Sequence, residues 1–471
     1  MLKKILCFFL FPLSLTAQPS YYEKVFGTAG NDMARSVKQI AGGSIFVFGN
    51  SDAPGNSDLS LSKLDSQGNL LWTLYYGGPA TENGFYLNTT SDGNLVFTGE
   101  TETAPNNLDV VMYKVDTSGA VIWSKSFASA VNETGKYIEQ TADGGYIISG
   151  SQNDALGLYD ILLLKTDAAG DYEWHQTLGR SDNEYGFMVH EVATGYILTA
   201  DTRSYGAGGY DVILYNLDPF GNERWSHTYG DSLQNGCQGL LLTSDGNYLS
   251  YGETETAPFS AFDAYLEKID TNGSSTWRYL YGGTGTDAIF SVREDTDGGY
   301  ICTGYSNSYN GMLPLDLVIF KVDAAGTLVW EQTYGSPGID IGYEIIPSID
   351  NNGFIIAGKT VAAGTDDYYL LKLDNNGLLS SVKTEENNGS FDVYPNPANG
   401  TVFLDYKLKT DFKNGSVVLL NPLGEMILEN ELHDAEGSVK IDVSALSAGI
   451  YFCSMIVDGQ TVISKKIVLH R

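Results

Sequence analysis

Carboxylates recur along this chain at a spacing that would bring them together in a folded repeat. One set lies ten residues after a recurring aromatic position: Asp32, Glu82, Glu133, Glu184, Asp287 and Asp340, with Asn235 in place of an acid. Six carboxylates at one mouth of a channel could hold a cation, and two at a suitable separation could act as general acid and base. We favour a third reading, in which each accepts hydrogen bonds from neighbouring backbone N–H groups.

A second recurring position carries mixed charges that would line a channel. It lies sixteen residues after the same aromatic register and reads Lys38, Asn88, Glu139, His190, Leu241, Arg293 and Ile346. His190 and Glu191 form the single acid–base-like neighbouring pair that stands out. The spacing of His175, His190 and His227 does not suggest a metal triad. With no nucleophile elbow and no phosphate-binding loop, the sequence predicts no catalytic residue and no metal site.

Aromatic residues in three long loops are the best candidates for ligand binding. The corresponding loops of the first three copies of the repeat are polar, whereas copies four to six gain aromatics. The candidates are Arg203, Tyr205, Tyr210, Phe259, Phe262, Tyr305 and Tyr309. Exposed aromatics on one side of a face would form a stacking site for sugar or peptide. Equally weighted is the alternative that these rings pack within their own loops.

All these positions belong to a repeat marked by tryptophan. The six tryptophans are 51, 51, 51, 52 and 53 residues apart: Trp72, Trp123, Trp174, Trp225, Trp277 and Trp330. A glycine stands four residues before each, and an aspartate three residues earlier still. A second aspartate comes five residues before a lysine, which is replaced by Asn216 in the fourth copy. A seventh copy keeps Asp374 and Gly377 but has Ser381 at the tryptophan place, so the chain contains seven copies.

Each copy reads as four short strands punctuated by Asp-Gly and Gly-Gly turns. In the second copy these are 85–90, 94–99, 110–115 and 121–127. Seven such units predict an all-β fold, a seven-bladed β-propeller. The seventh copy lacks its last strand, while Tyr22 lies 50 residues before Trp72 on the same register. We therefore expect the N-terminal segment to complete the seventh blade and close the ring.

The repeat resembles the tryptophan-docking motif of quinoprotein-type propellers. The shared pattern is Lys-x-Asp-x-x-Gly-x-x-x-Trp, one residue shorter between Asp and Gly than in that family. The resemblance implies that each tryptophan wedges between neighbouring blades as a structural residue. It does not imply the quinone cofactor, because no adjacent cysteine pair or cofactor-binding cluster accompanies it.

Charge and cysteine content limit the possible partners. Residues 18–390 carry 48 acids and 18 bases, against 10 and 7 in residues 391–471. An acidic chain argues against nucleic acid and anionic membranes, and solubility outside the cell explains the charge. Calcium is possible but has no motif, since Asp295-Thr296-Asp297-Gly298 reads as a hairpin turn; no cofactor is expected. We expect Cys237, Cys302 and Cys453 to be buried thiols, although Cys237 and Cys302 could pair.

Residues 1–17 read as a secretory signal peptide. Lys3 and Lys4 precede an apolar stretch from Ile5 to Leu15, and Ala17 is the expected cleavage position. The stretch is too short to span a membrane, and no other segment reaches 18 apolar residues. The sequence thus predicts export to the periplasm without a transmembrane span.

A separate module ends the chain. It begins with Tyr394-Pro395-Asn396-Pro397, contains Leu446-Ser447-Ala448-Gly449-Ile450-Tyr451, and finishes with a basic strand around Lys465-Lys466. These features resemble the type A C-terminal sorting domain of the type IX secretion system. The resemblance implies a β-sandwich export address, recognised by the secretion machinery and removed when the cargo reaches the cell surface.

Together these features predict a signal peptide (1–17), a seven-bladed propeller (18–380), a linker (381–390) and a sorting domain (391–471). The expected function is non-catalytic recognition of glycan or protein by a secreted or surface-displayed protein. Two alternatives remain: a glycan lyase or hydrolase that uses acids at the channel mouth, and a purely structural surface protein. A strongly perturbed acid pair in a pocket would favour the enzyme.

Overall fold

The computed structural model describes residues 21–379 and 389–469, apart from short gaps. The gaps are 54, 105–106, 155, 258–260, 309–313, 362–363, 397, 409–414, 421–425, 448 and 458–459. The expected signal peptide therefore lies outside the described residues. Contacts divide the chain into two units, Met1–Leu379 and Ser380–Arg471. In the described ranges every assigned element is a strand, so the fold is all-β.

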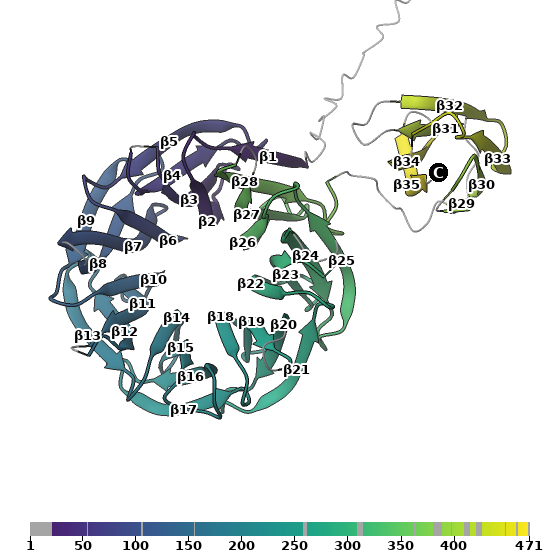
Figure 1. The fold of residues 1–471 in the computed structure, drawn as a ribbon. Coiled ribbons are helices and arrows are strands. Elements are labelled where there is room, and N and C mark those ends of the chain that lie inside the picture. Colours follow the sequence, from purple (N-terminus) through teal and green to yellow (C-terminus); the bar gives the residue numbers. More distant parts are fainter. Residues whose placement is uncertain are drawn as a thin grey trace, which may run out of the picture. The chain divides into compact units, whose positions relative to one another are not determined.

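Six consecutive four-stranded antiparallel sheets make up most of the first unit (Figure 1). We number them in chain order. The first holds β2 (Asp32–Gln39), β3 (Ile45–Ser51), β4 (Asp58–Leu64) and β5 (Leu70–Tyr76); the second β6 (Glu82–Thr89), β7 (Leu95–Ala104), β8 (Asn107–Val115) and β9 (Val121–Phe127); the third β10 (Glu133–Gln140), β11 (Tyr146–Asn153), β12 (Tyr159–Thr166) and β13 (Tyr172–Leu178). The fourth holds β14 (Glu184–Val192), β15 (Gly195–Thr202), β16 (Asp211–Leu217) and β17 (Glu223–Tyr229); the fifth β18 (Asn235–Leu242), β19 (Tyr248–Glu255), β20 (Phe262–Ile269) and β21 (Ser275–Tyr281); the sixth β22 (Asp287–Glu294), β23 (Tyr300–Ser306), β24 (Asp316–Val322) and β25 (Leu328–Tyr334).

The seventh sheet joins the two ends of this unit. It contains β26 (Ile341–Pro347), β27 (Phe354–Val361), β28 (Asp366–Leu373) and β1 (Tyr22–Phe26), in the order β1-β28-β27-β26. Tyr22 pairs with Lys372, and Phe26 pairs with Tyr368. The prediction that the N-terminal segment supplies the missing fourth strand is confirmed.

Each sheet has the form of a propeller-like blade, with its first strand facing the centre in Figure 1. The inner three strands are largely buried and the fourth is largely exposed, as in β5. Apolar clusters lie between neighbouring sheets. One cluster packs Val37 and Ile45 of the first sheet against Ile355 and Leu370 of the seventh, and Tyr22 belongs to it. Burial between sheets, more than within them, thus holds this unit together.

The tryptophans occupy the predicted junctions between sheets. Gly377 has φ of 73°, and a Cβ added to it would lie 2.6 Å from the ring of Trp330 on the preceding sheet. Only glycine combines this left-handed backbone with so close an approach. The same arrangement brings Tyr22 to Gly68, so Tyr22 occupies the tryptophan place of the missing copy. The fifth sheet differs, because Gly273 faces His227 instead of Trp225.

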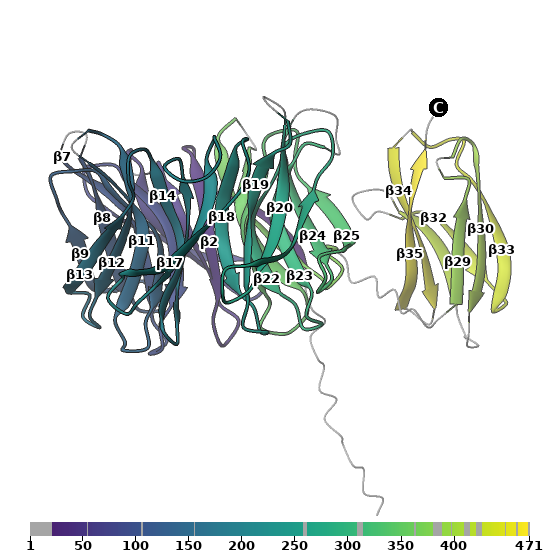
Figure 2. The same ribbon diagram turned by 90° about the horizontal axis from the view of Figure 1, so that it is seen from below.

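Residues 389–469 form a second unit of two sheets, described here on its own (Figure 2). The first sheet contains β29 (Gly389–Tyr394), β30 (Thr401–Leu408) and β33 (Glu436–Asp442), and the second β32 (Met426–Leu432), β31 (Gly415–Leu420), β34 (Gly449–Val457) and β35 (Gln460–Leu469). One core draws Val402 and Ile441 from the first sheet and Val417 and Met455 from the second. These sheets agree with the expected small β-sandwich, although β29 begins at Gly389, inside the segment expected to be linker.

Cys237, Cys302 and Cys453 are free and buried, as expected. Burial raises the pKa of the Cys237 thiol to about 12 and that of Cys453 to about 12, so both remain protonated at neutral pH. No helix in the described ranges is long and apolar enough to cross a membrane.

Candidate functional site

Every innermost strand of the seven sheets contains a β-bulge at the same place. The pairing with the next strand skips one residue, or two in β14, where Met188 is also skipped. The skipped residues lie thirteen positions after the aromatic register: Arg35, Phe85, Lys136, Phe187, Gln238, Phe290 and Tyr343. We call these seven the axial residues. A bulge turns a side chain away from the regular alternation of its strand, so a repeated bulge can aim one residue per sheet at the centre.

The axial residues meet around one cavity. All seven line a space of about 160 Å³, together with Tyr86, Tyr137 and Met188. Three pairs of sequence neighbours therefore face the same cavity, which a regular strand would not allow because successive side chains point to opposite faces. The bulges thus build the site, and they also make its lining differ around the centre.

Cations and aromatic rings alternate along part of this lining. The Arg35 guanidinium carbon lies 5.5 Å from the ring centroid of Phe85 and 5.5 Å from that of Tyr343. Lys136 Nζ lies 4.0 Å from the ring centroid of Phe85, so this ring contacts both cations. The rings of Phe290 and Tyr343 are 5.3 Å apart. Such contacts stabilise the cations without neutralising them.

Two tyrosines that directly follow axial residues in sequence already use their hydroxyl groups in hydrogen bonds to carboxylates. The rings of Tyr86 and Tyr137 lie 4.5 Å apart. Tyr86 donates to Glu344 Oε1 at 3.1 Å, and Tyr137 donates to Glu139 Oε2 at 3.1 Å. They therefore offer the cavity mainly apolar ring surface.

Glu344 gathers groups from three sheets beneath these tyrosines. Its carboxylate lies 2.6 Å from Lys38 Nζ of the first sheet and 2.6 Å from Arg293 Nη2 of the sixth. It also accepts the Ser36 hydroxyl at 2.6 Å and the backbone N–H of Val37 at 2.7 Å. Burial alone would raise the pKa of Glu344, but Lys38 and Arg293 hold that pKa below its usual value.

The position sixteen residues after the aromatic register was expected to line a channel with mixed charges. Its charged residues are instead paired within the protein. Lys38 and Arg293 do face the centre, but both bind Glu344, which lies two positions earlier in its own repeat and was missed. Glu139 and His190 form a second pair, with Nδ1 2.7 Å from Oε2. The other His190 nitrogen lies 3.0 Å from the Leu240 carbonyl oxygen, so both ring nitrogens have partners. Glu191, the expected partner of His190, instead accepts the backbone N–H of Ala142.

Three acids on second strands are buried or half-buried: Glu100 of β7, Asp201 of β15 and Glu253 of β19. Burial raises the pKa of Glu100, an effect opposed by Asn83, Lys136 and Arg35. Burial likewise raises the pKa of Glu253, which accepts the Tyr305 hydroxyl at 3.2 Å. Asp201 has its pKa raised strongly by burial and accepts the backbone N–H of Cys237 at 2.7 Å. None of these three acids lines the axial cavity.

The acids ten residues after the aromatic register accept hydrogen bonds from backbone N–H groups, which is the interpretation that the sequence favoured. Asp32 accepts the backbone N–H of Thr28 at 2.5 Å, and Asp340 accepts that of Ser336 at 2.8 Å. Comparable bonds reach Glu184 and Asp287. These acids therefore hold the loops that enter the innermost strands. In the described ranges, no group of three or more His, Cys, Asp or Glu could hold a metal ion.

Each member of this set also meets the aspartate that starts the third strand of the preceding sheet. A Cβ at Gly77 would lie 2.5 Å from Glu82 and 2.8 Å from Asp58, so this glycine leaves room for the pair. Burial, with the nearby Asp58, raises the pKa of Glu82 to about 7. Raised pKa values recur at Glu133, Asp160, Asp263, Asp316, Asp340 and Asp367, with burial as the first cause and a neighbouring carboxylate contributing to each. We call these seven junctions the acid collar; at the fifth, Asn235 replaces one acid and donates to Asp211 at 3.4 Å.

The loop aromatics occupy several separate places. Tyr205 packs against the core of the fourth sheet, with the Arg180 guanidinium 4.4 Å from its ring centroid. Tyr210 continues a row of rings through Tyr185 to Tyr159, and Arg203 lies 5.1 Å from its centroid. The row is only half-buried.

Of the remaining candidates, Tyr305 points to the axial group. Its ring lies 5.7 Å from that of Phe290. Phe262 is half-buried at the start of β20. Phe259 and Tyr309 lie outside the described residues. The structure thus places Tyr205 and Tyr210 in one loop of the fourth sheet and Tyr305 near the centre.

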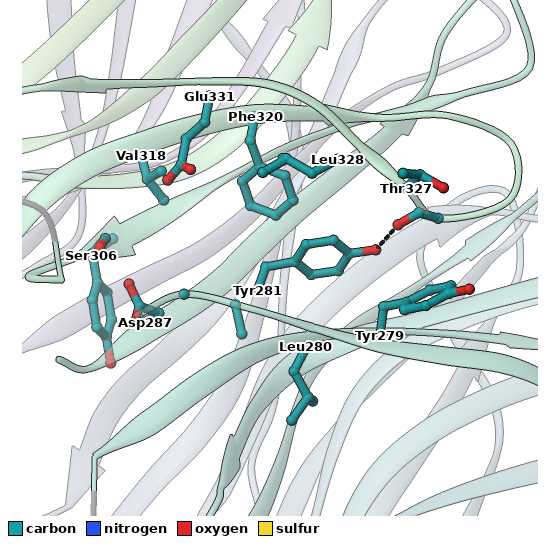
Figure 3. A pocket seen from close by; sticks show the side chains of 14 residues that line it. Tyr279, Leu280, Tyr281, Asp287, Ser306, Val318, Phe320, Thr327, Leu328 and Glu331 are labelled. Atoms are coloured by element: carbon teal, nitrogen blue, oxygen red, sulfur yellow. Dashed lines mark hydrogen bonds between the residues drawn. The ribbon is translucent and has the colours of Figure 1, made fainter. Parts of the chain in front are cut away.

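A larger cavity of about 310 Å³ lies at the junction of the fifth and sixth sheets (Figure 3). Tyr279, Leu280 and Tyr281 of β21 line one side, and Val318 and Phe320 of β24 line the other. The Tyr281 hydroxyl donates to the carbonyl of Gly326 at 2.6 Å. The same bond recurs at three other junctions, through Tyr76, Tyr229 and Tyr334. This cavity therefore lies at a structural junction whose Tyr–Gly hydrogen bond recurs around the first unit.

Residues 392–470 match a family model described as a secretion system C-terminal sorting domain. The match confirms the resemblance seen in the sequence and does not extend to the sheets before it. It implies export by the type IX secretion system, through contact with its machinery, to the outer surface or the medium. No curated protein matches the chain.

Solved structures of similar shape come from several classes of protein. Sqt1 from Chaetomium thermophilum is 12% identical with a TM-score of 0.44, over 82% of this chain and 97% of that chain. Puromycin hydrolase is 12% identical with a TM-score of 0.46, over 82% and 60%. PorZ, a surface component of the type IX secretion system of Porphyromonas gingivalis, is 10% identical with a TM-score of 0.28, over 93% and 81%. These similarities carry no argument about ligand or activity.

Proposed function

We propose that this protein is a secreted or surface-displayed binding module, a closed seven-bladed β-propeller that recognises a glycan or protein ligand without catalysis. Support for closure comes from the seventh sheet, which contains both β1 and β28, and from the apolar cluster that joins it to the first sheet. Support for export comes from the sorting domain.

One observation carries the binding proposal: the seven bulges bring side chains of five types, Arg, Lys, Gln, Tyr and three Phe, around a single cavity. Most other repeated positions keep one residue type, because they serve a joint that recurs from blade to blade. A binding site on a ring needs asymmetry, and the axial residues supply it around a cavity, whereas the charged residues of the other variable position are already paired within the protein. Concave sites of this kind, apolar with a few polar groups, are where ligands bind most often.

The chemistry of the cavity favours binding over hydrolysis. Glycoside hydrolysis requires two carboxyl groups flanking the scissile bond, and no Asp or Glu lines the axial cavity. The acid pairs with raised pKa values do exist, but they recur around the whole acid collar, where they hold loops. Because the acid pairs recur from junction to junction, we assign them a structural role. The half-buried row of Tyr159, Tyr185 and Tyr210, with Arg203, is a second contact surface in this proposal.

The test is a binding screen with the chain from residue 18 to residue 471. The protein is applied to immobilised neutral glycans, acidic glycans and peptides, and each binder is then measured by titration. Replacing Phe85 and Phe290 by Leu should weaken binding by roughly 1–3 kcal/mol, the usual range for interface aromatics. The matched control is Phe220→Leu, a ring that is 67% exposed on an outer turn.

Three outcomes decide the assignment. Loss of binding in the axial double variant alone, at an unchanged melting temperature, supports it. If Tyr210→Ala weakens binding and the axial double variant does not, the ligand binds at the loop surface and not at the axial cavity. Turnover of any glycan, or no binder in the whole panel, contradicts a binding function at the axial cavity.

A further inference from the structure

The axial cavity is positively charged in a strongly acidic protein. The chain has 58 acidic and 27 basic residues, yet the charged residues lining this cavity are Arg35 and Lys136. A low-dielectric concave site concentrates the field of such charges. The sign of its charge is therefore opposite to that of the protein as a whole.

These two cations differ from the other central cations in having no carboxylate partner. Lys38 and Arg293 each lie 2.6 Å from Glu344. In the described part of the chain, neither Arg35 nor Lys136 takes part in an ion pair or donates a hydrogen bond, and Arg35 Nε is buried without an acceptor. A buried guanidinium N–H without an acceptor is costly, and the side chain carries further N–H donors that a ligand oxygen in the cavity could accept from.

The nearest opposing charge is weakened by its surroundings. Glu100 acts on both Lys136 and Arg35, but its carboxylate accepts Asn83 Nδ2 at 3.0 Å, and burial raises its pKa. Lys136 is enclosed by the blades yet keeps exposed surface at the cavity, and this enclosure lowers its pKa while Glu100 opposes the change. Positive charge thus remains available at the mouth.

The rest of the cavity suits an apolar group. Phe85, Phe187, Phe290 and Met188 line it with apolar side chains, and the hydroxyls of Tyr86 and Tyr137 are already used. Besides the two cations, the remaining polar side chains of the lining are Gln238 and Tyr343, which are too few for the several hydroxyl groups of a sugar ring. A buried sugar ring would leave several hydroxyl groups without partners, at a cost for each. The volume, about 160 Å³, is close to the roughly 150 Å³ of a cavity known to hold one six-membered ring.

We propose that the axial cavity binds the end of a peptide chain, with its terminal carboxylate on Arg35 and Lys136 and an apolar last side chain among the phenylalanines. This inference rests on the proposed binding function and specifies its ligand. Arg35 is well placed for such recognition, because its planar guanidinium presents several donors to one carboxylate while Phe85 and Tyr343 hold its faces.

The experiment uses two N-terminally fluorescein-labelled hexapeptides, identical except at the end. Both end in phenylalanine; one has a free carboxylate and the other a carboxamide. Fluorescence anisotropy is measured with the chain from residue 18 to residue 471 at low salt. The free acid should bind at least tenfold more tightly, and Arg35→Gln should remove the difference. Arg224→Gln, an exposed cation on an outer strand, is the matched control and should keep it.

Further arms separate this inference from the function on which it rests. Equal binding of acid and amide, both lost in the Phe85 and Phe290 double variant, overturns the carboxylate assignment and leaves the axial site intact. Tighter binding of a trigalacturonate, also dependent on Arg35, shows that the acidic ligand is a sugar and overturns the peptide. If nothing binds in a manner sensitive to the axial variants, both proposals fail. Melting temperatures of all variants confirm that they are folded.

Discussion

Lys38 Nζ lies 2.6 Å from Glu344 Oε1, which joins the first sheet to the last across 306 residues of sequence. Glu344 also binds Arg293, so this one carboxylate is the shared counter-charge of two enclosed cations. The cluster lies directly beneath the tyrosines of the axial cavity. Its removal should therefore disturb both stability and the shape of the site.

Replacing Glu344 by Gln should destabilise the first unit by about 3–5 kcal/mol, because two buried cations would then face each other without a counter-charge. Urea unfolding followed by tryptophan fluorescence measures this, since all six tryptophans lie between residues 72 and 330. The control is Lys125→Met, which breaks an ion pair of the first unit with the exposed carboxylate of Asp171 and should change stability by less than about 1 kcal/mol. Equal, small effects would show that the cluster contributes nothing.

Deleting residues 18–28 should destabilise the whole first unit. The seventh sheet would lose β1, and Gly68 would lose the ring of Tyr22. The expected result is a large drop in the melting temperature of the tryptophan-monitored transition. Tyr22→Trp, which restores the residue used at six other registers, should preserve or raise it. An unchanged melting temperature in the deletion would contradict a structural role for this strand.

The acid collar predicts that stability falls as pH rises from about 5 to 7.5. The pKa of Glu82 is raised from its ordinary value of 4.5 to about 7, so the folded protein holds this proton more tightly than the unfolded chain. Its contribution is full below pH 4.5 and is lost as pH rises through 7. Glu82→Gln copies the amide already found at Asn235 and should flatten the fall. Glu223→Gln, at an exposed site, should leave the slope as it is.

Trp174→Ala should cost about 3–5 kcal/mol through lost burial and an unfilled space at the junction with Gly221. Any ligand should still bind the folded fraction with its original affinity. Thermal unfolding and a titration at a temperature where the variant is folded test both parts. Loss of affinity at unchanged stability would show that the tryptophan contacts ligand.

Removing residues 391–471 should keep the protein inside the outer membrane while leaving the first unit folded. The sorting domain is the export address, and the two units have separate cores. Cell fractionation locates the truncated chain, and tryptophan fluorescence reports its folding. Normal amounts at the cell surface would show that another signal directs export.

Sequence periodicity was enough to predict the scaffold. In the second copy the registers predicted all four strands, although β7 (Leu95–Ala104) and β8 (Asn107–Val115) are longer than the predicted 94–99 and 110–115. Tyr22 on the same register predicted the composite seventh sheet. The aspartates proved to be loop-holding groups because a residue repeated in each copy must satisfy the same local geometry. The sorting domain was recognisable from its terminal motifs.

The axial residues were not found from the sequence because a β-bulge breaks the alternation on which such predictions rely. Positions ten and sixteen after the register were considered, whereas the skipped residue at position thirteen was not. The position varies in chemistry, as Arg35, Phe85, Lys136 and Gln238 show, but the residue that follows it varies as well, so variation alone would not have marked it. The binding role of the loop aromatics stays a prediction, since Phe259 and Tyr309 lie outside the described residues. Sequence shows that Tyr205 is in a loop, but not that its ring packs on the sheet below.

The composite seventh sheet also sets the order of folding. Tyr22 must wait for Lys372, its partner 350 residues later, before β1 can pair. Contacts of such long sequence separation form slowly, because the loop-closure entropy is lost before they are made. Strand β1 is therefore synthesised before its partner and is among the last strands to form its backbone hydrogen bonds. Until then its partner β28 has an unpaired edge, and unpaired strand edges make partly folded chains prone to aggregation.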